Sequence, residues 1–135
     1  MSGLLIDDIS MRFVLPQGGS VQALKNVTLD IKSGELLSVL GPSGCGKTTL
    51  LNIIAGFLAP TNGQIVINDR AVKGPGAERG MVFQQGALFE WMTVRQNVSF
   101  GPDMKKMPRS ESVRIVDRLL EVVGLQDFKD KAVYE

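Results

Sequence analysis

The chain has 135 residues, of which 44% are hydrophobic and 21% charged, a composition typical of one folded globular domain rather than of a disordered tail or a coiled coil. Its 15 Lys and Arg residues against 14 Asp and Glu residues leave a formal net charge of +1, which supports neither a nucleic-acid partner nor binding to an anionic membrane surface. The start Met1–Asp8 lacks the basic and apolar regions of a signal peptide, no apolar stretch approaches the roughly 20 residues that span a bilayer, and the single Cys45 cannot form an internal disulfide.

The first predicted strands differ in the faces that they bury. The segment 21–31 alternates in places, with Val27, Leu29 and Ile31 on one face, and this pattern predicts a half-buried strand. The segment 36–40 is apolar on both faces, which predicts a strand covered by structure on each side. This second segment runs directly into a glycine-rich loop.

A helix is predicted after that loop. From Lys47 onward, apolar residues recur at helical spacing, and Pro60 and Gly63 are expected to end the helix soon after Phe57. The apolar positions are Leu50, Leu51, Ile54 and Leu58.

Short strands are predicted next. The segments 64–68 and 70–73 read as two strands joined by a tight turn at Asn68-Asp69, and the segment 80–83 reads as another.

The segment Ser110–Val123 predicts a further helix, which Gly124 ends. One face of this helix carries Val113, Val116, Leu119, Leu120 and Val123. The order of strands, glycine loop, helix, strands and helix predicts an α/β domain.

The segment Gly41–Thr48 matches the phosphate-binding pattern G-x-x-x-x-G-K-[ST] at every required position. Glycines allow backbone N–H groups to wrap a triphosphate closely, and the start of the following helix adds a positive potential. Lys47 is expected to reach the β- and γ-phosphates, and the Thr48 hydroxyl to coordinate Mg²⁺. The residues expected to bind the nucleotide are Gly41, Pro42, Ser43, Gly44, Cys45, Gly46, Lys47, Thr48 and Thr49. The alternative, a glycine-rich turn that fits by chance, has a probability of roughly 1% in a chain of this length.

The segments on either side of this loop indicate which nucleotide-binding family is involved. Ala23–Ile31 followed by Gly34-Glu35 resembles the segment that leads into the phosphate loop of ABC (ATP-binding cassette) ATPases. Leu51–Gly56 resembles their next helix, and Gly80–Gln84 resembles their Q-loop. No guanine-reading Asn-Lys-x-Asp motif occurs, which weighs against a GTPase, and a small-metabolite kinase remains the alternative.

Two later segments are similar to the ATPases of taurine, aliphatic-sulfonate and nitrate importers. They are Gly74–Gly80 and the pattern Leu88, Trp91, Val94, Asn97-Val98, Phe100-Gly101. A kinase would not explain Gln84 and this pattern together.

The resemblance implies a P-loop NTPase fold of the ABC ATPase type. Residues 1–33 would form an antiparallel β-subdomain, residues 34–84 a phosphate-loop core with part of a parallel sheet, and residues 85–135 the start of a helical subdomain. The implied function is to couple ATP binding and hydrolysis to the import of a small anionic solute such as taurine, sulfonate or nitrate. The implied cofactors are ATP and Mg²⁺.

The resemblance also implies roles for single residues. Gln84 would act with Lys47 in catalysis, as a residue that reaches Mg²⁺ and the attacking water, while the alternative is a polar residue that ends a strand. Phe13 would stack on adenine from the loop after the first strand, while the alternative is a ring that caps a small core. Trp91 is either a packing anchor or a contact for the permease.

The partners implied by the resemblance are the transmembrane permease subunits, a second copy of the ATPase and, indirectly, a solute-binding protein. The implied location is the cytoplasmic face of the cell membrane.

Several family motifs do not occur in these 135 residues: the Leu-Ser-Gly-Gly signature, an apolar strand ending in Asp-Glu, and a histidine. We therefore expect a truncated ATPase that is inactive or nearly so by itself, or alternatively a non-hydrolysing nucleotide-binding fragment. Because the strands that flank segment 36–40 would come from later in such a chain, we expect this segment to lack neighbours.

Overall fold

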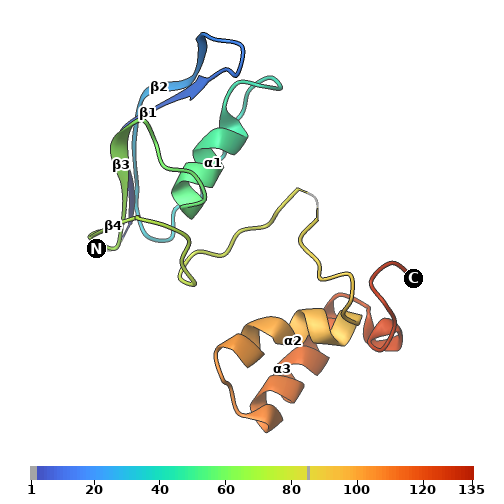
Figure 1. The fold of residues 1–135 in the computed structure, drawn as a ribbon. Coiled ribbons are helices and arrows are strands. Elements are labelled where there is room, and N and C mark those ends of the chain that lie inside the picture. Colours follow the sequence, from blue (N-terminus) through green and yellow to red (C-terminus); the bar gives the residue numbers. More distant parts are fainter. Residues whose placement is uncertain (1–2, 85) are drawn as a thin grey trace. The chain divides into compact units, whose positions relative to one another are not determined.

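The computed structural model describes residues 3–84 and 86–135, and the chain divides into two compact units (Figure 1). The first unit ends at Met81 and holds the sheet and one helix. The second runs from Val82 to Glu135 and is helical.

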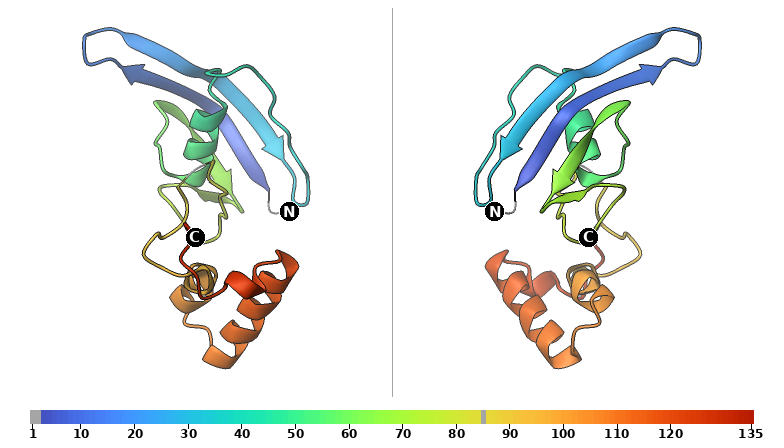
Figure 2. Two further views of the ribbon diagram at one scale, coloured as in Figure 1. Left: turned by 90° about the vertical axis from the view of Figure 1, so that its right-hand side faces the viewer. Right: turned by 90° about the vertical axis from the view of Figure 1, so that its left-hand side faces the viewer.

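The sheet of the first unit is antiparallel throughout and has the strand order β2-β1-β3-β4. Strands β1 and β2 form a long hairpin, which Figure 2 shows extending past the other two strands. The strands are β1 (Leu4–Val14), β2 (Ser20–Ile31), β3 (Asn62–Ile67) and β4 (Arg70–Ala71). The strands predicted over 21–31 and 64–68 are therefore confirmed, and so is the antiparallel β-sheet near the N-terminus, while the strand predicted over 70–73 is formed only at Arg70 and Ala71.

The turn between β3 and β4 follows from two residues with left-handed backbone. Asn68 has φ 50° and Asp69 has φ 62°, and the strands around them pair Ile67 with Arg70. Positive φ at both central residues matches the right-handed twist of a two-residue hairpin, and Asn and Asp tolerate it better than other side chains.

Helix α1 (Lys47–Ala55) packs on one face of the sheet and closes the core of the first unit. The helix contributes Leu50 and Ile53, and the sheet contributes Ile6, Ile9, Met11, Leu24 and Ile65. The helix ends at Ala55, before the end predicted soon after Phe57, because Gly56 adopts φ 83° and its N–H bonds back to Asn52 and Ile53. A residue in this conformation terminates a helix and is usually glycine.

Two predicted strands are absent from the described residues, and those predictions were wrong. Segments 36–40 and 80–83 pair with no other strand, so the partial parallel sheet expected around the phosphate loop is not formed. Leu36 is 95% exposed, as expected for a segment without neighbours. Apolar sequence alone does not make a strand, because each strand needs a partner for its backbone hydrogen bonds.

The second unit contains α2 (Val94–Met104), α3 (Arg109–Val122) and the short helix η1 (Gln126–Phe128). The helix predicted over 110–123 is confirmed, with Val116 and Leu120 buried and Gly124 following its end at φ 70°. Val113, Leu119 and Val123 are exposed instead of buried, so the apolar stripe is narrower than predicted. Within the residues that the structure describes, no helix has the length and apolar character needed to cross a membrane.

Candidate functional site

The glycine-rich loop leads directly into α1 and presents that helix's N-terminus. Gly44 and Gly46 have φ values of 79° and 96°, which only glycine adopts readily. The first helical hydrogen bond runs from the Leu50 N–H to the Gly46 carbonyl at 2.9 Å, and no side chain caps the helix. The N–H groups of the first helical turn lack partners within the helix, so they form a donor cluster suited to an anion.

The loop is anchored on the sheet through Gly46. A Cβ atom built on Gly46 would lie 2.7 Å from the Ala23 carbonyl oxygen and 2.9 Å from the Leu24 side chain, both in β2. At the other end of the loop, a Cβ on Gly41 would lie 2.8 Å from the Cys45 sulfur. The motif therefore needs glycine at 46 for packing as well as for backbone conformation.

The Lys47 side chain folds back over the loop that precedes it. Its Nζ donates to the carbonyl oxygens of Gly41 at 2.7 Å and Pro42 at 2.6 Å, and lies 3.5 Å from the Cys45 sulfur. The ammonium group is thus placed among the atoms of the loop, next to the positive end of the helix. Both features favour a polyphosphate at this place.

The two threonines after Lys47 lie in the first turn of α1, Thr48 exposed and Thr49 half-buried. A hydroxyl oxygen is a hard ligand of the kind that Mg²⁺ prefers. The described residues contain no group of three His, Cys, Asp or Glu side chains that could hold a metal ion. The Thr48 hydroxyl is a donor that would suit a Mg²⁺ ion whose other ligands are phosphate oxygens.

Phe13 lies within β1, near its end, and not in the loop after that strand. It pairs across the hairpin with Val21 and is 38% exposed. Ala23, which contacts the loop at Gly46, lies only two residues beyond Val21. The same hairpin thus carries Phe13 and touches the loop.

Gln84 belongs to the second unit, where it lies exposed in a bend. The glycine-rich loop belongs to the first unit, so the role of Gln84 in catalysis and metal binding stays a prediction.

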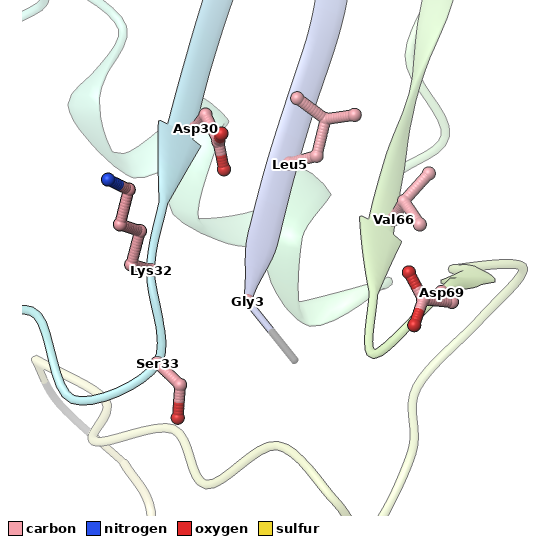
Figure 3. A pocket seen from close by; sticks show the side chains of 7 residues that line it. All are labelled: Gly3, Leu5, Asp30, Lys32, Ser33, Val66 and Asp69. Atoms are coloured by element: carbon pink, nitrogen blue, oxygen red, sulfur yellow. The ribbon is translucent and has the colours of Figure 1, made fainter. Parts of the chain in front are cut away.

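A pocket of about 790 Å³ lies elsewhere, where Leu5 pairs with Asp30 on one side and with Val66 on the other (Figure 3). It is lined by Gly3, Leu5, Asp30, Lys32, Ser33, Val66 and Asp69, none of which belongs to the glycine-rich loop. With two carboxylates against one ammonium, this surface does not favour a polyanion. The candidate nucleotide site is therefore the loop at α1.

Asn97 is a residue whose contacts were not predicted from the sequence. Its side chain makes four hydrogen bonds to the backbone of the turn that precedes α2. The capping pattern Thr93-x-x-Gln96 marks the start of α2 and could have shown that a helix begins here.

Comparisons with known proteins place the fold and the loop in a family. The family model described as "ABC transporter" matches residues 24–135. The protein named taurine import ATP-binding protein TauB is 69% identical over the whole chain in Roseobacter denitrificans and 72% identical in Ruegeria pomeroyi. The chain spans half the length of each of these relatives.

The structural comparison agrees with the sequence comparison. A dimeric post-hydrolysis state of the ATP-binding cassette MJ0796, bound to ADP and Pi, matches with a TM-score of 0.83 and 28% identity. The match covers 97% of this chain and 62% of the cassette. A second structure, of CbiO1 from Clostridium perfringens, matches with a TM-score of 0.72 and 30% identity over 97% of this chain and 54% of the other.

Proposed function

The chain belongs to the ABC transporter family, and from this premise we propose that its loop Gly41–Thr48 binds ATP·Mg to power the import of a small solute. The observation that carries the proposal is the position of the Lys47 ammonium, within hydrogen-bonding distance of the Gly41 and Pro42 carbonyl oxygens at the N-terminus of α1. A lysine placed there meets the β- and γ-phosphates of a nucleotide whose phosphates occupy the loop.

The remaining residues of the proposed site have separate tasks. The backbone N–H groups of the loop and of the first turn of α1 orient the phosphates, and Thr48 holds Mg²⁺ through its hydroxyl. Mg²⁺ held there would supply positive charge that offsets the charge developing on the phosphates during phosphoryl transfer. We propose that Phe13 stacks on the adenine ring and that Gln84 reaches Mg²⁺ and the attacking water.

The solute and the partners of the importer are proposed from the relatives. Proteins that are 69–72% identical are named for taurine import, so taurine or a similar sulfonate is the proposed solute. Two solved structures of the cassette MJ0796 are described as dimeric, which supports a dimer of ATP-binding subunits. The proposed partners are the permease subunits and, through them, a solute-binding protein, with the ATP-binding subunit on the cytoplasmic face of the membrane.

Trp91 is the proposed contact for the permease. Its side chain is 79% exposed, which does not fit a packing anchor and favours a contact surface.

Nucleotide binding without hydrolysis is a second candidate function. Membrane vesicles that contain the permease and the ATP-binding subunit distinguish the two candidates. We expect uptake of labelled taurine that requires ATP and is lost in Lys47→Ala. Tight ATP binding without uptake of taurine or any other sulfonate would support the second candidate.

A further inference from the structure

The side chain of Asn97 lies inside the turn formed by residues 88–93. Its Oδ1 accepts a hydrogen bond from the Phe89 N–H at 2.8 Å. Its Nδ2 donates to the carbonyl oxygens of Phe89 at 3.1 Å, Thr93 at 3.0 Å and Met92 at 3.3 Å. An asparagine amide has two N–H donors and an oxygen with two lone pairs, so the backbone of one turn satisfies both donors and one lone pair.

The turn has little regular structure of its own. Within it, the Met92 N–H donates to the Phe89 carbonyl at 3.0 Å, and Thr93 forms the capping box of α2 with Gln96. Residues 88–92 belong to no helix or strand. The shape of the turn therefore depends on Asn97, which bonds both to its start at Phe89 and to its end at Thr93.

The helix that carries Asn97 is itself fixed at its N-terminus. The Val94 N–H donates to the Lys131 carbonyl at 3.0 Å, and the Arg95 N–H donates to the Lys129 carbonyl at 2.8 Å. The Arg95 guanidinium forms an ion pair with Asp117 of α3 at 2.8 Å. Asn97 thus links the turn to the N-terminal part of α2, which the segment 129–131 and helix α3 hold in place.

The turn presents the Trp91 side chain to solvent. The Trp91 ring lies 5.3 Å from the Phe89 ring, and Phe89 lies 4.6 Å from the Phe100 ring of α2. The indole is exposed although the Phe89 ring lies beside it. An exposed tryptophan held in one position loses little freedom on binding, which is the property of an effective interface anchor.

We propose that Asn97 is a positioning residue that fixes the turn 88–93 so that Trp91 is preorganised to contact the permease. This inference rests on the proposed function, because it assumes that Trp91 contacts the permease. Asn97 does not touch the partner in this account and acts only through the backbone of the turn.

The first test measures the motion of the Trp91 side chain by time-resolved fluorescence anisotropy. The sample is a form of the protein in which Trp91 is the only tryptophan. Asn97→Asp keeps the size of the side chain and the acceptor but loses both N–H donors, and its charge repels three carbonyl oxygens. We expect the amplitude of nanosecond motion to rise about twofold in Asn97→Asp and Asn97→Ala, while far-UV circular dichroism shows the helices intact. Ser99→Ala is the matched control, because Ser99 lies on the same helix and its hydroxyl bonds to Gln96 and Asp103 and not to the turn in the described part of the chain. Unchanged motion of Trp91 in Asn97→Asp would overturn the proposal.

The second test is a double-mutant cycle on the affinity of the ATP-binding subunit for permease-containing vesicles. We expect Trp91→Ala to weaken this affinity about tenfold or more and Asn97→Asp to weaken it severalfold. The double variant should be no weaker than Trp91→Ala alone, because Asn97 acts through Trp91. Additive losses would overturn that link. If Trp91→Ala binds normally while Asn97→Asp still mobilises the indole, the failure lies in the proposed permease contact and not in the turn.

Discussion

Gly46 packs so closely against Ala23 that a Cβ atom at position 46 would lie 2.7 Å from the Ala23 carbonyl oxygen. This contact joins β2 to the phosphate loop immediately before α1. Because carbonyl oxygens of a paired strand cannot move freely, a side chain at 46 would displace the loop from the sheet.

Gly46→Ala should therefore disturb both folding and nucleotide binding. The backbone conformation at φ 96° costs roughly 1–3 kcal/mol for a residue with a Cβ, and the clash with Ala23 adds to it. We expect ATP·Mg affinity to fall at least about tenfold, by titration, and the urea midpoint of unfolding to drop. Gly44→Ala is the matched control, because it has φ 79° but a Cβ there would meet nothing within 4 Å. Equal losses in the two variants would show that the Ala23 contact has no role.

The single cysteine reports directly on the loop. Cys45 is exposed and lies 3.5 Å from the Lys47 ammonium. Maleimide should modify it readily in the free protein, and saturating ATP·Mg should slow the reaction by covering the loop. Labelling can be followed by mass spectrometry, since the chain offers one thiol only. A labelling rate that does not change with nucleotide would mean that phosphate does not cover the loop at Cys45.

Replacing Phe13 tests the proposed adenine contact separately from the phosphate contact. Phe13→Ala should weaken ATP binding about tenfold, because stacking of a base on an aromatic ring contributes ~1–3 kcal/mol. Phe13→Tyr should bind normally, and inorganic tripolyphosphate should bind equally to all forms. Val14→Ala is the control, because Val14 is the adjacent and more exposed residue of the hairpin. Normal ATP affinity in Phe13→Ala would remove Phe13 from the site.

The parts of the fold that could be predicted from sequence depend on local chemistry. The phosphate loop is specified by Gly44, Gly46 and Lys47, each of which has a conformational or chemical role within a few residues. Helix α3 and strand β2 follow from periodicity, and the turn at Asn68-Asp69 follows from the tolerance of these residues for positive φ.

The parts that could not be predicted depend on distant partners. Segments 36–40 and 80–83 have strand-like sequence but pair with no strand in the described part of the chain. Helix α2 was not predicted, because its sequence contains Gly101 and Pro102 and the helix buries no residue fully. The contacts of Asn97 could not be predicted either, because they depend on the fold of another segment. An asparagine with polar neighbours in sequence resembles a surface residue until the turn that surrounds it is known.

The central claim, that the loop Gly41–Thr48 binds the phosphates of ATP with Lys47 over the β- and γ-phosphates, is tested most directly by comparing nucleotides. ATP, ADP and AMP should be titrated in the presence of Mg²⁺ into wild-type protein, Lys47→Ala and the control Lys25→Ala, which replaces an exposed lysine of β2. We predict that wild-type and Lys25→Ala bind ATP and ADP but bind AMP at least about tenfold more weakly, because AMP lacks the phosphates that Lys47 reaches. In Lys47→Ala the affinity for ATP should fall strongly and that for ADP less. An equal loss for ATP and ADP, or no difference among the three nucleotides in the wild-type protein, would contradict the account.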